Sequence, residues 1–144
     1  MTKTRVRKKK TDYQRAKANH WKAFSRYIRR RDCLKTTGSP DIGRCVTCNK
    51  LYNYADLQAG HYLPGRSNGI LFDERGCHAQ CRGCNLWGRG QQARYHKYML
   101  KVYGQEVIDE LHEKAQGYCK ITIEEHREET IRLNRLAQEL EGSD

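Results

Sequence analysis

Apolar residues near the start of the chain are spaced for a helix. Between Thr11 and Arg31 they recur three and four positions apart, and this spacing predicts a helix with one apolar face. Thr11 or Asp12 is suited to cap its start, because a short side-chain oxygen can accept from the first unpaired backbone N–H groups. The segment TTGSP at 36–40 contains glycine and proline and predicts a loop after the helix.

The C-terminal part of the chain shows three more helical patterns. They cover about residues 91–103, 106–115 and 123–140, and Gly104 is the candidate C-cap of the first of them. Acidic residues open the last segment, which suits the positive end of a helix dipole.

A hairpin is expected in the middle of the chain. LQAGHYL (57–63) and ILF (70–72) have the character of strands, and PGRSNG (64–69) between them is rich in turn-forming residues. Helices at both ends and a hairpin between them predict an α+β fold.

These elements divide the chain into three parts. Residues 1–31 are expected to form a basic arm and helix, residues 32–104 the core, and residues 105–144 C-terminal helices. The apolar side of the last helix predicts either a homodimer contact or packing on its own domain.

Positive charge is concentrated at the N-terminus. The net charge is +11, and residues 1–31 hold 13 lysines and arginines against one acid, whereas the remainder holds 15 basic and 16 acidic residues. Such a segment suits a polyanion, because its cations neutralise phosphates and release counterions. A solvated tail or a localisation signal is the alternative. The candidate DNA-binding residues are Arg5, Arg7, Lys8, Lys9, Lys10, Lys17, Lys22, Arg26, Arg29, Arg30, Arg66, Arg82 and Arg89.

The composition narrows the class of protein. Hydrophobic residues make up 37% of the chain, so the core is thin and a metal, a partner or nucleic acid is expected to add stability. No apolar run is as long as a membrane span and no apolar segment follows the basic start, so we expect a cytoplasmic protein without a membrane partner. The odd count of seven cysteines argues against a disulfide framework.

Four of the cysteines have the spacing of a zinc site. Cys45 and Cys48 form one Cys-x-x-Cys pair, Cys81 and Cys84 form another, and 32 residues separate the two pairs. Two such pairs supply the four thiolates of a tetrahedral structural Zn²⁺, which adds folding energy to a small unit. In a competing assignment, Cys77 or His78 replaces one of these four cysteines. Cys33 and Cys119 are expected to be ordinary buried residues.

One histidine and one asparagine stand beside these pairs. His61 lies in the predicted first strand, between the two cysteine pairs, and Asn85 directly follows Cys84. A lone histidine in an apolar strand is more often a core residue, so its position between the pairs is what favours a chemical role.

This arrangement resembles the HNH, or ββα-metal, nucleases, and especially those of the endonuclease VII type with two zinc knuckles around a hairpin. LQAGHYLPGRSNGILFDERGCHAQCRGCN resembles the NinG/Rap recombination-protein family of lambdoid phages, and the resemblance covers about residues 30–103. It implies a small ββα-metal hairpin-plus-helix core, stapled by a four-cysteine zinc site and flanked by N- and C-terminal helices. It also implies a structure-specific DNA endonuclease for branched recombination intermediates such as Holliday junctions and D-loops, acting in a bacterial host cell if the chain is phage-encoded.

The resemblance also assigns roles to residues. His61 would be the general base that activates water, and Asn85 would place its amide oxygen on a catalytic Mg²⁺ or Mn²⁺. The chain departs from the endonuclease VII pattern at Gly60, where that pattern has a metal-binding Asp, and at Gly76, where the middle Asn would fall.

Other residues could complete the catalytic metal shell. Asp73, Glu74 and His78 are the weaker candidates, and His96 could approach the phosphate or be a surface histidine.

Two other functions fit part of the pattern. A non-catalytic zinc-stabilised nucleic-acid-binding module would need the cysteines and the basic arm but neither His61 nor Asn85. A zinc-stabilised adaptor would use its C-terminal helix to bind a protein.

Overall fold

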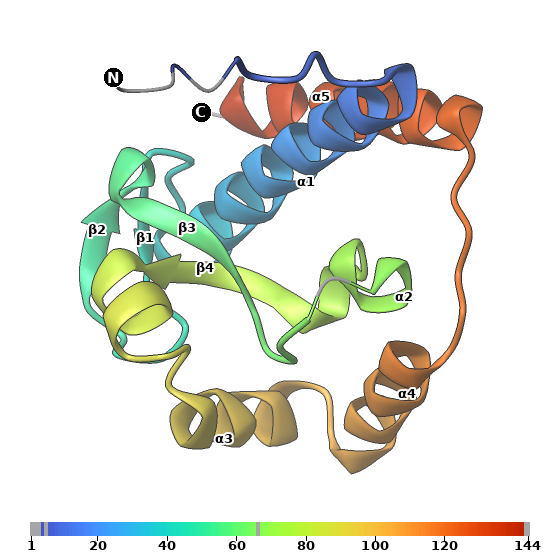
Figure 1. Cartoon of the computed structure of the whole chain (residues 1–144). Coiled ribbons are helices and arrows are strands. Elements are labelled where there is room, and N and C mark those ends of the chain that lie inside the picture. Colours follow the sequence, from blue (N-terminus) through green and yellow to red (C-terminus); the bar gives the residue numbers. More distant parts are fainter. Residues whose placement is uncertain (1–3, 5, 66, 143–144) are drawn as a thin grey trace.

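The long helix α1 (Asp12–Thr37) is the element on which much of the fold packs (Figure 1). This computed structural model describes residues 4, 6–65 and 67–142. α1 begins at a capping box, in which the Thr11 hydroxyl accepts from the Gln14 N–H at 3.1 Å and the Gln14 side chain accepts from the Thr11 N–H at 3.0 Å. The expected cap at Thr11 is therefore confirmed.

The predicted end of this helix at residue 31 was wrong. α1 continues through the two threonines of TTGSP, where the hydroxyl of Thr36 donates to the carbonyl of Asp32 at 2.7 Å. Gly38 ends the helix with φ 80°, a backbone conformation that glycine adopts readily. The boundary expected between the N-terminal part and the core thus lies inside a continuous helix.

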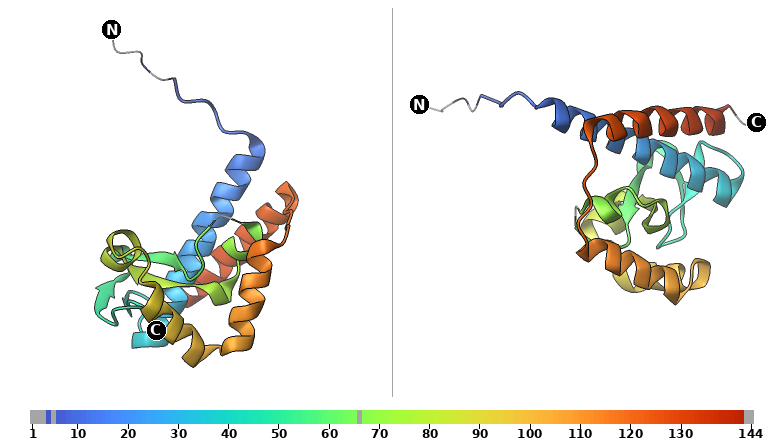
Figure 2. Two further views of the ribbon diagram at one scale, coloured as in Figure 1. Left: turned by 60° about the horizontal axis from the view of Figure 1, so that its bottom comes forward. Right: turned by 90° about the vertical axis from the view of Figure 1, so that its right-hand side faces the viewer.

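Helix α5 (Ile123–Glu141) lies along α1, although the two are at opposite ends of the sequence (Figure 2). Leu133 is buried in one apolar cluster with residues of α1, and Ala137 is fully buried. The apolar side of α5 therefore packs on its own chain. Ile131 stays outside this packing and is 71% exposed.

A pair of histidines is buried where α1 meets α5. The Nδ1 atoms of His20 and His126 lie 2.8 Å apart, and the His20 ring stacks on Phe72 with centroids 3.6 Å apart. One Nδ1 must donate and the other accept, so at least one ring is neutral. Burial, reinforced by His126, lowers the pKa of His20 to about 4.

This pair predicts a loss of stability in mild acid. The unfolded chain takes up a proton at His20 near the ordinary pKa of 6.5, whereas the folded chain resists it down to about pH 4, so the unfolded state binds more protons in that window. We expect the urea midpoint to fall as pH is lowered from about 6.5 to about 4. The variant His20→Gln should reduce this slope, and the exposed His112→Gln should leave it unchanged. An identical slope in His20→Gln and wild type would contradict the assignment.

The central sheet pairs β3 (Leu57–His61) with β4 (Cys77–Cys81) in antiparallel register, with Gly60 opposite His78. The first predicted strand is confirmed, but the second, at 70–72, was wrong because α2 (Asn68–Leu71) forms there. The true partner strand is buried at all five positions, so it lacks the alternation that identifies a half-exposed strand.

A second pair of strands surrounds the first cysteine pair. β1 (Ile42–Arg44) and β2 (Leu51–Asn53) are antiparallel, and the turn between them carries Cys45 and Cys48. Each strand has three residues, too few to be stable as an isolated hairpin, and the sequence pattern did not predict them.

The two faces of the β3–β4 sheet are covered differently. Ala59 and Cys77 pack on the α1 side with Phe24 and Ile28, whereas His78 points to the opposite side, where it contacts Tyr95. The side chains of Arg31 and Asp32 fasten α1 to β4: the Asp32 carboxylate accepts from the Ala79 N–H at 2.7 Å, and Arg31 donates to the Cys77 carbonyl at 2.8 Å.

The opposite side is closed by α3 (Gln92–Val102) and α4 (Gln105–Gln116), which confirms two further predicted helices. Gly104 follows the last turn of α3 with φ 86° and donates to the Met99 carbonyl at 3.1 Å, as expected of a helix-ending glycine. Across the described ranges of the chain, none of the helices combines the length and the apolar character that a bilayer crossing requires.

Candidate metal centre and adjoining site

The four paired cysteines converge on one point. The sulfur atoms of Cys45, Cys48, Cys81 and Cys84 all lie within 4.8 Å of one another. Cys48 and Cys81, from different pairs, have Sγ atoms 3.9 Å apart. Tetrahedral zinc with Zn–S bonds of about 2.3 Å requires sulfurs about 3.8 Å apart, so the cluster can bind a metal such as zinc.

Backbone N–H groups point at two of these sulfurs. The Cys48 N–H points to Cys45 Sγ at 3.5 Å, and the Cys84 N–H points to Cys81 Sγ at 3.4 Å. Burial alone would raise the pKa of Cys45, but hydrogen bonds from the backbone at Cys48 and Cys81 outweigh it and lower that pKa to about 6. A zinc bound by all four thiolates would have no open position for a substrate and would therefore be structural.

The alternative ligands of this centre lie elsewhere. Cys77 is fully buried against α1, and His78 is buried between the hydroxyls of Tyr95 and Tyr103 at 3.2 and 2.9 Å. Within residues 4, 6–65 and 67–142, the four paired cysteines are the one group of three or more potential Cys, His, Asp or Glu ligands that come together.

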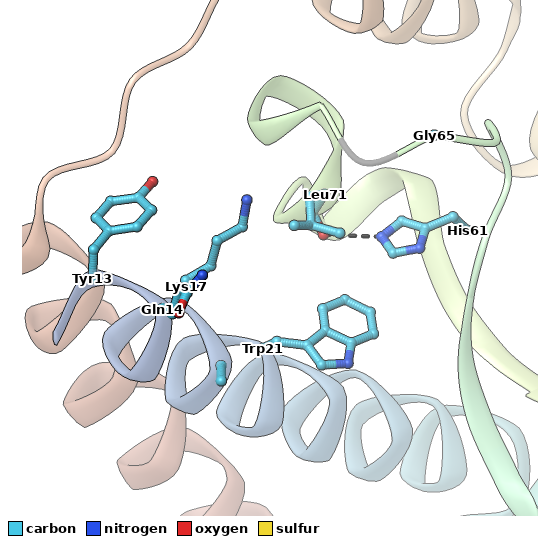
Figure 3. A pocket seen from close by; sticks show the side chains of 8 residues that line it. Tyr13, Gln14, Lys17, Trp21, His61, Gly65 and Leu71 are labelled. Carbon is cyan, nitrogen blue, oxygen red and sulfur yellow. Dashed lines mark hydrogen bonds between the residues drawn. The ribbon is translucent and has the colours of Figure 1, made fainter. Parts of the chain in front are cut away.

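His61 ends β3 and faces α1. Its Nε2 lies 2.9 Å from the Leu71 carbonyl, and its ring stacks on Trp21 with centroids 5.3 Å apart (Figure 3). A carbonyl oxygen only accepts, so Nε2 carries the proton and the lone pair of a neutral ring lies on Nδ1.

Asn85 lies in the π-helical turn Gly83–Trp87, directly after the second cysteine pair. Its Nδ2 donates to Gln58 Oε1 at 2.8 Å. Side chains alternate along a strand, so Gln58 and His61 leave β3 on opposite faces. The structure therefore gives His61 and Asn85 different neighbours and does not bring them into one cluster.

Gly60 is required by the close packing of the sheet. A Cβ at this position would lie 2.9 Å from Gln80 Cβ, closer than real contacts allow. A metal-binding Asp could not occupy it without moving β4, which accounts for this departure from the endonuclease VII pattern.

The weaker metal candidates are held in internal contacts. Burial raises the pKa of Asp73, but hydrogen bonds from Arg75 and Lys114 outweigh it and hold that pKa below its ordinary value. Glu74 pairs with Arg132 at 3.3 Å.

The aromatic cage around His78 lowers its pKa to about 4 through burial, so this ring is neutral and structural. His96 Nδ1 lies 2.6 Å from the hydroxyl of Tyr62, a buried residue that packs in the core. This pair was not foreseen from the sequence.

Twelve of the thirteen candidate basic residues fall into three groups, and the remaining one, Lys17, donates to Asn68 Oδ1 at 2.9 Å. Arg7, Lys8, Lys9 and Lys10 are exposed ahead of α1, as are Lys22 on α1 and Arg82 and Arg89 beside the second cysteine pair. Three arginines of α1 instead make internal contacts: Arg26 and Arg30 pair with Glu141, and Arg29 lies over the Tyr54 ring at 4.3 Å. Arg5 and Arg66 lie outside the described residues.

A pocket of about 400 Å³ opens between α1 and the segment that follows β3 (Figure 3). It is lined by Tyr13, Gln14, Lys17, Ala18, Trp21, His61, Gly65 and Leu71. The sequence carried a signal for its α1 wall, because Tyr13, Lys17 and Trp21 are four residues apart and share one helix face.

Known proteins similar to this chain come from lambdoid phages. The family model described as "Bacteriophage Lambda NinG protein" matches residues 1–142. Protein ninG of Escherichia phage 933W is 31% identical over 100 residues, which are 69% of this chain and 49% of that protein. Protein ninG of Escherichia phage lambda is 34% identical over 82 residues, which are 56% of this chain and 39% of that protein.

The chain belongs to the NinG family. It spans about half the length of the curated relatives it matches. No solved structure matches it significantly.

The cysteine cluster predicts the zinc content of the protein. Wild type should carry about one zinc per chain, and Cys81→Ser should lose most of it and unfold at lower temperature, because metal binding contributes folding energy. Cys119 was expected to be buried but is exposed and lies outside the cluster, so Cys119→Ser should change neither quantity. Elemental analysis and thermal unfolding measure both, and full zinc retention by Cys81→Ser would refute the four-cysteine assignment.

Proposed function

We propose that this chain is a metal-dependent endonuclease that hydrolyses phosphodiester bonds in branched DNA, such as Holliday junctions and D-loops. The observation that carries the proposal is the convergence of the two cysteine pairs. It ties β1–β2 to β4, and β4 in turn pairs with β3, the strand that ends in His61. Membership of the NinG family and the resemblance to HNH nucleases support it.

His61 is the general base in this proposal. The Leu71 carbonyl holds the ring through Nε2, so Nδ1 is the nitrogen that takes the proton of the attacking water. His61 also lines the pocket that contains Lys17 of α1, a cation that would attract a phosphate backbone.

Asn85 is the proposed ligand of a catalytic Mg²⁺ or Mn²⁺. Such ions keep several waters and often use one or two protein oxygens together with substrate phosphates, and the bound ion would neutralise charge that develops on the phosphate. The described carboxylates do not gather around Asn85, so the protein offers no preformed cage for this ion.

The separation of His61 from Asn85 favours a second candidate function. A zinc-stabilised nucleic-acid-binding module would use the same cysteine cluster and the same basic segment without hydrolysis. It would need neither side chain at a phosphate.

A homodimer remains part of the proposal. Two strands of a junction are cut at symmetric positions, which calls for two active sites. The buried side of α5 is occupied by α1, so a second copy would use other surfaces, among them the exposed Ile131.

Cleavage of a synthetic four-way junction tests the proposal. Wild type with Mg²⁺ or Mn²⁺ should nick the junction but not a linear duplex of the same sequence. The variant His61→Ala should bind the junction normally and cut it at least about 100-fold more slowly, because a general base contributes that much or more. His112→Ala, which removes an exposed histidine on α4, should cut at the wild-type rate.

Each outcome separates the two functions. Junction binding without cleavage under either metal, by wild type and variant alike, would replace the nuclease with the binding module. If His61→Ala cuts the junction at the wild-type rate, His61 is not the general base.

A further inference from the structure

We propose that the pocket between α1 and α2 receives an unpaired nucleotide of a DNA ligand, with the base against Trp21 and a phosphate near Lys17. This inference rests on DNA as the ligand, as in the proposed function, and adds the feature of the DNA that is recognised.

The walls of the pocket have the shape and chemistry of a base-binding site. Tyr13, Lys17 and Trp21 come from one face of α1, and His61 and Leu71 stand opposite them (Figure 3). The volume of about 400 Å³ lies in the range of sites for small organic ligands. Aromatic side chains bind bases of any sequence, because every base has a π face that can stack.

The charge of the pocket favours an anion. Among the described residues that line it, Lys17 is the one cation and none carries a carboxylate. The Lys17 ammonium donates to the Asn68 side-chain oxygen at 2.9 Å, and this amide is neutral, so the positive charge is not cancelled there. Exposed Lys8, Lys9 and Lys10 lie a few residues ahead of Tyr13 along the chain and add positive charge to this end of α1.

These two properties together select an unpaired nucleotide. A base inside a duplex is stacked on both faces by its neighbours and cannot present a face to Trp21, whereas a base freed at a branch or a gap can. Because His61 lines the same pocket, a nucleotide held there also brings the adjoining phosphates to the proposed general base. Recognition of the freed base would therefore restrict cleavage to DNA that contains one.

The two tryptophans of the chain allow a direct test. Trp21 lines the pocket, whereas Trp87 is 77% exposed in the turn after the second cysteine pair. In a Trp87→Phe background, Trp21 is the one tryptophan left. Its emission should be quenched by a duplex that carries one unpaired purine and change little with the fully paired duplex, both titrated without added divalent metal.

Affinity measurements decide whether Trp21 causes the preference. Wild type should bind the duplex with the unpaired purine more tightly than the paired one, and Trp21→Leu should lower affinity for the former roughly ten-fold with little change for the latter. Trp21→Tyr, which keeps an aromatic ring, should retain most of the preference. Trp87→Leu is the matched control and should leave it unchanged. Zinc content and circular dichroism of each variant establish that the fold is intact.

The outcomes are distinguishable from those of the cleavage assay. If Trp21→Leu and Trp21→Tyr both keep the wild-type preference for the unpaired purine, the inference is overturned, even if junctions are cut. Equal quenching of Trp21 by paired and unpaired DNA also overturns it. A preference that depends on Trp21 sustains it, even if no cleavage is observed.

Discussion

The convergence of four thiolates on one point is the constraint on which the rest of the structure depends. The β1–β2 hairpin has three residues in each strand, and the β3–β4 sheet has two strands, so neither is expected to be stable alone. The cluster joins the turn of the first hairpin to the end of β4. A metal bound there would supply the folding energy that this thin core lacks.

Helix α1 is the second element that holds the sheet in place. It covers one face of the β3–β4 sheet, is fastened to β4 by Arg31 and Asp32, and carries α5 on its other side. The same helix supplies Lys17 and Trp21 to the pocket beside His61. The arrangement gives α1 two roles, because its apolar residues build the core while Lys17 and Trp21 line a pocket.

Local features of this fold could be predicted from the sequence. The Thr11 cap and the helix-ending Gly104 depend on neighbouring residues alone, and the spacing within each cysteine pair is set by the geometry of a metal turn. The partner of β3 could not be predicted, because Cys77–Cys81 is buried on both faces and so lacks the alternation of a half-exposed strand. The arrangement of the proposed active site could not be predicted either. His61 and Asn85 were both assigned to the active site, but the neighbours of His61 depend on strand register and on Trp21, and those of Asn85 depend on Gln58, which is distant in sequence.

X-ray absorption at the zinc edge of the purified protein tests the central claim most directly. If the two cysteine pairs share one metal, the spectrum should show four sulfur neighbours at about 2.3 Å. A shell that contains nitrogen or oxygen, or fewer than four sulfurs, would contradict the convergence on which this account of the fold and its site rests.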